Sequence, residues 1–129
     1  MLQRLINISE KLTRDLHKDN TEMDVYVTCF HIDEWDAKIS RSIEPILVHI
    51  TYDSYDRFIP LKIGKKGNVT KQKVSYDGGI PYGFVELLFF EEESQANEYF
   101  ILQHEKYIKM LEQNIIKAKN NLEKFRNAC

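Results

Sequence analysis

Three residues with metal-binding or nucleophilic side chains, Cys29, His31 and Asp33, alternate along one predicted strand. Alternate residues of a strand point to the same face, so these side chains form a candidate three-ligand set for a metal-dependent or ligand-binding enzyme. The competing interpretation is a buried thiol beside a histidine at the rim of the sheet, because Val25 and Val27 continue the same face. The sequence has no second Cys/His cluster at metal-ligand spacing, so we favour the buried thiol and predict no metal ion, cofactor or catalytic residue.

A predicted hairpin carries a concentration of positive charge. Its lysines, with no acidic residue among them, are Lys62, Lys65, Lys66, Lys71 and Lys73. Such a hairpin suits contact with phosphates or with an acidic protein surface, although lysines also protect exposed strand edges from aggregation. Acidic residues gather elsewhere, at Asp33, Glu34, Asp36 and residues 91–93, and the net charge is −2. This segregation favours a protein partner over nucleic acid for the lysine hairpin.

The last third of the sequence carries a heptad repeat. Its a and d positions, here called the a/d stripe, are Ile101, His104, Ile108, Leu111, Ile115, Ala118, Leu122 and Phe125. Such a stripe is typical of a helix that packs along another helix. The alternative is packing on the chain's own sheet, because the 3.5- and 3.6-residue periods diverge by only about 80° over four heptads. Length favours self-association, because a helix over residues 94–126 is about 48 Å long and a seven-residue strand covers only about 23 Å.

Charges beside the stripe indicate how two such helices would be oriented. The e positions hold Glu105, Glu112, Lys119 and Arg126. In an antiparallel pair the e positions of the two helices face each other. Glu105 then approaches Arg126 of the second chain, and Glu112 approaches Lys119 of the second chain. In a parallel pair e faces g, where no opposite charges meet. We therefore predict an antiparallel homodimer whose interface comprises the a/d stripe and these four charged residues.

The remaining patterns predict one α+β domain over residues 1–129. Leucine and isoleucine recur at helical spacing in residues 1–18, and residues 94–126 form the long heptad helix. Between them, residues 23–90 predict a four- to five-stranded antiparallel sheet with hairpins. Residues 37–44 suggest a polar connection, and residues 82–90, apolar on both faces, predict a central strand.

Composition limits the class of protein. The chain is 43% hydrophobic and 29% charged, as in folded proteins, and no apolar run approaches the roughly 20 residues that span a membrane. The start of the sequence does not resemble a secretory leader, and two cysteines suggest free thiols in a reducing cytoplasm. We expect a non-enzymatic protein that binds and modulates another macromolecule, such as a phage-encoded inhibitor of host defence or an immunity-type protein. The alternatives are a nucleic-acid-binding protein that uses the lysine hairpin and an enzyme that uses Cys29, His31 and Asp33.

Overall fold

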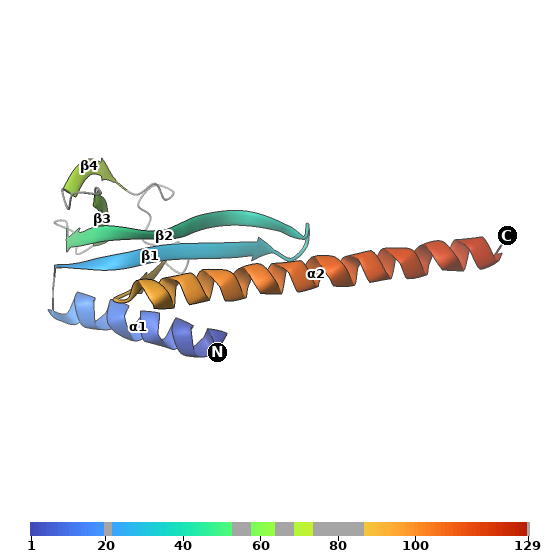
Figure 1. Ribbon diagram of the computed structural model, residues 1–129, viewed down its shortest axis with the longest axis horizontal. Coiled ribbons are helices and arrows are strands. Elements are labelled where there is room, and N and C mark those ends of the chain that lie inside the picture. Colours follow the sequence, from blue (N-terminus) through green and yellow to red (C-terminus); the bar gives the residue numbers. More distant parts are fainter. Residues whose placement is uncertain (20–21, 53–57, 64–68, 74–86, 129) are drawn as a thin grey trace.

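The computed structural model describes residues 1–19, 22–52, 58–63, 69–73 and 87–128 (Figure 1). Its elements, in chain order, are α1 (Leu2–Asp19), β1 (Met23–Asp33), β2 (Lys38–Tyr52), β3 (Phe58–Ile63), β4 (Val69–Lys73), β5 (Leu88–Phe90) and α2 (Glu93–Ala128). The strands pair antiparallel in the order β4-β3-β2-β1-β5. The predicted α+β class, with a short N-terminal helix, an antiparallel sheet and a long C-terminal helix, is confirmed.

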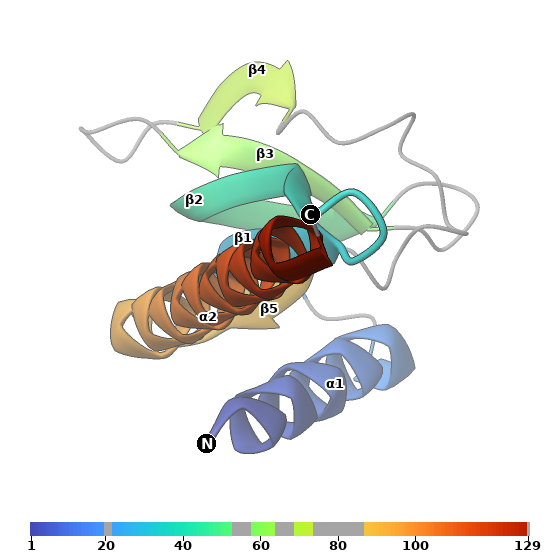
Figure 2. The same cartoon turned by 90° about the vertical axis from the view of Figure 1, so that its right-hand side faces the viewer.

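The helices pack on three of these strands, β1, β2 and β5. This part of the sheet has fewer strands than the four or five predicted for the whole sheet. Figure 2, a view along α2, places both helices near the β1–β5 end and β3 and β4 toward the other end. One apolar cluster fills the space between helices and sheet; its buried members are Leu5, Phe30, Leu88, Phe90, Ala96 and Tyr99. A second cluster is centred on Val25, Val27, Val48, Ile50 and Phe89. Burial of these apolar side chains holds the sheet and the helices together.

The polar connection predicted for residues 37–44 is wrong, because β2 already begins at Lys38. Half-buried Ile39 and Ile43 alternate with exposed Ser40 and Ser42, which is the period of a strand with one covered face. A tight turn joins β1 to β2 instead. The Asp33 carboxylate accepts hydrogen bonds from the backbone N–H groups of residues 35 and 36, at 3.0 and 3.3 Å, as aspartate does in many turns.

The strand predicted for residues 82–90 is not central. Of this range the structure describes residues 87–90, and β5 lies at the edge of the described sheet, paired with β1 alone. It is nevertheless buried, because α1 covers it. The N–H group of Phe89 donates a 2.9 Å hydrogen bond to Ser9 Oγ on α1, so the helix satisfies a backbone group on this edge strand. Its apolar composition therefore reflects cover by a helix.

Candidate binding surface on the C-terminal helix

The first half of α2 packs on the chain's own sheet through side chains three or four residues apart. Ala96 and Tyr99 are buried, and the ring of Phe100 lies edge-on to that of Phe30 on β1, with 5.2 Å between centroids. Two hydrogen bonds fix the helix along the hairpin that β1 and β2 form. Gln103 Nε2 donates to the backbone carbonyl of Phe30 at 3.0 Å, and the Tyr107 hydroxyl donates to the carbonyl of residue 37 at 3.3 Å. The helix is therefore attached as far as the β1–β2 turn.

The second half of α2 extends past this turn. The helix has 36 residues and is about 54 Å long, whereas the 11 residues of β1 span about 36 Å. Every residue from 112 to 128, a segment we call the arm, is exposed. Figure 1 shows the arm projecting beyond the sheet and α1. Tertiary packing does not stabilise this part of the helix within the described chain.

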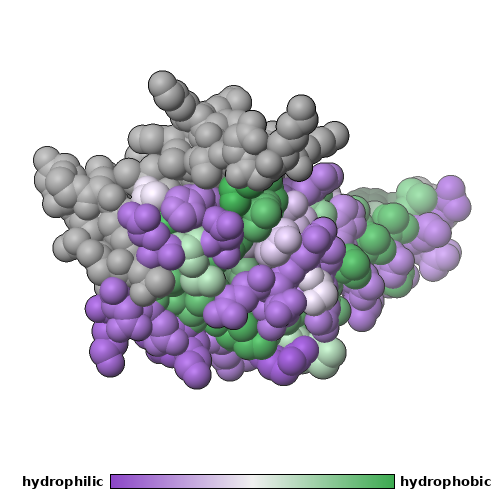
Figure 3. Space-filling model, turned by 60° about the vertical axis from the view of Figure 1, so that its left-hand side comes forward, coloured by the Kyte–Doolittle hydropathy of each residue, from purple (hydrophilic) through white to green (hydrophobic). Residues whose placement is uncertain are grey.

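The arm carries half of the predicted a/d stripe into solvent, and two exposed isoleucines of the stripe precede it on α2. The exposed large members of the stripe are Ile101 at 54%, Ile108 at 45%, Ile115 at 54%, Leu122 at 50% and Phe125 at 75%. Figure 3 shows hydrophobic side chains in green along the projecting helix, interleaved with hydrophilic ones. A row of half-exposed isoleucine and leucine side chains at heptad spacing is characteristic of an interface.

The exposed isoleucines at the start of the a/d stripe point away from the face of α2 that packs on the sheet. Tyr107 reaches the turn, and Ile108, the next residue, points about 100° further round the helix. The same offset separates Phe100, which packs on β1, from exposed Ile101. The alternative explanation of the heptad, packing on the chain's own sheet, therefore does not account for these isoleucines.

Two members of the stripe lie at the boundary between the faces. Leu111 is half-buried. The His104 ring is exposed, yet it lies 5.1 Å from the ring of Phe30 and 6.1 Å from that of Phe100. His104 thus already contributes to packing within the chain, while Ala118 in the arm is exposed.

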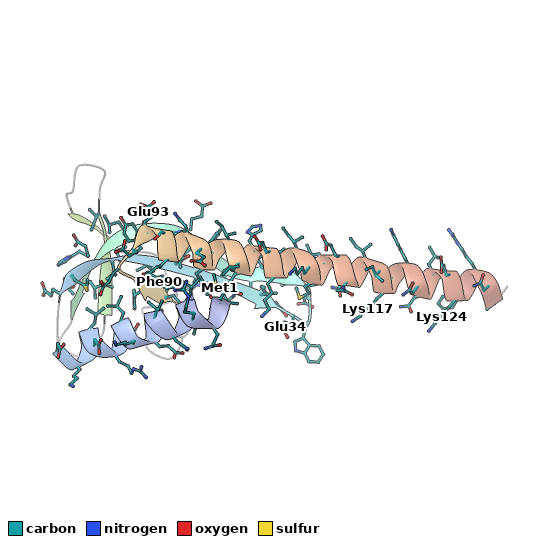
Figure 4. All side chains as sticks on the ribbon, turned by 60° about the horizontal axis from the view of Figure 1, so that its bottom comes forward. Met1, Glu34, Phe90, Glu93, Lys117 and Lys124 are labelled. Atoms are coloured by element: carbon teal, nitrogen blue, oxygen red, sulfur yellow. The ribbon has the colours of Figure 1, made fainter. Side chains whose placement is uncertain are left out.

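The four charged e-position residues are all exposed along the same helix: Glu105, Glu112, Lys119 and Arg126. Within the part of the chain that the structure describes, none of them forms an ion pair. Lys117 and Lys124 project together from one side of the arm, as labelled in Figure 4. The arm therefore has an apolar stripe, a flank of mixed charge and a separate basic side.

The residues that suggested enzyme chemistry lie elsewhere and are otherwise engaged. Cys29 is fully buried, and the Asp33 carboxylate is occupied by the turn. Together with half-buried His31, they do not form a metal site, and the described residues contain no group of three His, Cys, Asp or Glu side chains suited to a metal. The prediction for the lysine hairpin lies outside the described residues at Lys65 and Lys66, and only the backbone is described for Lys62, Lys71 and Lys73.

Two exposed features were missed by the sequence patterns. Trp35, in the β1–β2 turn, is 97% exposed, and Ile116 on the arm is 49% exposed although it lies outside the a and d positions. A cross-strand hydrogen bond also joins β1 and β2, in which His49 Nδ1 lies 2.8 Å from Asp24 Oδ1. The pairing register of two strands decides such contacts, and composition alone gives no signal for them.

The chain matches no protein-family model, no curated protein and no solved structure. Across the residues that the structure describes, neither helix combines the length and the apolar character needed to cross a membrane.

Proposed function

We propose that this chain is a non-enzymatic binding protein that self-associates through a coiled coil of α2 and acts by binding another macromolecule. The observation that carries the proposal is the a/d stripe of the arm, where Ile115, Leu122 and Phe125 remain half or more exposed. Exposure of this much regularly spaced apolar surface is costly unless another surface covers it.

The engagement of the candidate catalytic groups supports the non-enzymatic part of the proposal. A fully buried thiol is a poor nucleophile, and a carboxylate that accepts hydrogen bonds in a turn has a structural role. Small size and segregated charge also suit the inhibitor or immunity class, including inhibitors carried by phages, that the sequence favours.

A photo-crosslinking experiment tests whether the stripe is the contact surface. The purified chain would carry p-benzoylphenylalanine in place of Leu122 and, in a matched control, in place of Lys117 on the basic side of the arm. Irradiation at micromolar concentration should give a covalent species of twice the chain mass from position 122 and little from position 117. Equal yields from both positions, or no such species from either, would contradict the proposal.

A further inference from the structure

The orientation and register of the helix pair can be inferred from the part of α2 that the fold leaves uncovered. Resting on the self-association proposed above, we infer that the occupant of the stripe is a second copy of this chain, antiparallel, with its symmetry axis between residues 115 and 118. Ile115 then packs against Ala118, Leu111 against Leu122, and Ile108 against Phe125 of the second chain.

The extent of the exposed surface supports this register. The overlap runs from Ile108 to Phe125, which begins where the hairpin ends at Tyr107 and continues almost to the end of the helix. Every stripe residue of the arm therefore has a partner in the second chain, whereas Ile101 and the sheet lie outside the overlap. A parallel pair would instead extend the contact to Ile101 and set the two sheets side by side at one end.

Charge complementarity supports the same register. It brings Glu112 to Lys119, and Glu105 to Arg126, of the second chain, and all four side chains are exposed and free of ion pairs within the described residues. A parallel pair would place e positions against Asn114 and Asn121, which carry no charge. A second copy of the chain thus meets the arm with matching hydrophobic spacing and opposite charge.

The inferred dimer is a rod with a sheet domain at each end. Counting along the shared axis, the two Tyr99 residues lie about 50 Å apart at 1.5 Å per residue. Such an arrangement presents two identical surfaces that can engage a repetitive or two-fold symmetric target at once, which raises overall affinity without any new contact.

Disulfide trapping distinguishes the orientations. In a Cys129→Ser background, Ile115→Cys and Ala118→Cys chains would be prepared separately, with buried Cys29 left unchanged. Because a disulfide needs Cα atoms within about 7 Å, mild oxidation should link the chains only when the two variants are mixed. Crosslinking of either variant alone would show a parallel pair and overturn the inference.

Light scattering on the same samples tests self-association separately from the inferred register. Twice the chain mass without crosslinking in the mixture would overturn the register but leave self-association intact, whereas the mass of one chain would refute self-association itself. Charge reversal gives a second test. Glu112→Lys should weaken the dimer roughly five- to tenfold, and adding Lys119→Glu should restore the original dissociation constant. Equal dissociation constants for all three proteins would also overturn the inferred orientation.

Discussion

Ile115 and Ile116 offer a matched pair of substitutions that tests whether the stripe, and not apolar surface in general, drives association. The two residues are adjacent on the arm and similarly exposed, at 54% and 49%, but only Ile115 occupies an a position. Replacing either with alanine raises helix propensity equally, so differences in the helix itself cancel. We expect Ile115→Ala to weaken the dimer and Ile116→Ala to leave it nearly unchanged.

The magnitude follows from the surface that Ile115 still has to bury. Full burial of an isoleucine side chain contributes about 1.5 to 3 kcal/mol, so covering the exposed half contributes about 1 kcal/mol per chain. The interface contains two copies of the residue, giving about 2 kcal/mol per dimer, which corresponds to roughly a 30-fold increase in the dissociation constant.

Sedimentation equilibrium across micromolar concentrations would measure the three dissociation constants, for the original chain and both variants. Circular dichroism would check that the fold is retained, as expected because Ile115 lies on the exposed arm. If both substitutions shifted the dissociation constant equally, the heptad spacing would have no bearing on association. A single-chain mass for the original protein at every concentration would refute the reasoning completely.

Two further predictions concern the fold. Ser9→Ala should lower the free energy of unfolding by about 1 to 3 kcal/mol, because the buried Phe89 N–H group loses its acceptor. The control Ser42→Ala, at an exposed position, should change it by less than about 0.5 kcal/mol. Urea unfolding of both variants measures the two changes. Burial raises the pKa of Tyr99 above 10.0, outweighing the hydrogen bond from Gln103, which lowers it. Because the folded state favours the neutral phenol, the free energy of unfolding should fall as pH rises from about 10. Tyr99→Phe should flatten this decline when melting is measured as a function of pH. An unchanged decline in that variant would contradict the prediction.

The heptad could be predicted from the sequence because its members are mostly isoleucine and leucine, which stand out among charged neighbours. The face of α2 that packs on the sheet could not, because it relies on alanine, tyrosine and glutamine at positions 96, 99 and 103. Gln103 is polar, yet it is needed where the Phe30 carbonyl at the edge of β1 requires a donor. Only the three-dimensional position of that edge explains the choice.

Strand limits were predicted less well than strand existence, for a related reason. The beginning of β2 contains Ser40 and Ser42, which give it a polar composition although its alternation is that of a strand. Pairing with β1 also shifts register twice, and at one shift Thr28 Oγ donates to the Ile43 carbonyl at 2.8 Å. Pro45, which cannot donate to a ladder, lies next to this irregularity, and bulges of this kind depend on both strands at once.

The angle between the two faces of α2 also explains how one helix can serve both the fold and an interface. Near Ile108 the stripe lies about 100° from the face that Tyr107 presents to the hairpin, so a second helix there would run beside the sheet without displacing it. A 3.5-residue repeat drifts by about 20° per heptad on a straight helix, which turns the stripe toward the sheet-facing side as the arm continues. By Phe125 the hairpin has ended, and that side is open to solvent. The stripe therefore remains accessible to a second helix as it continues along the arm.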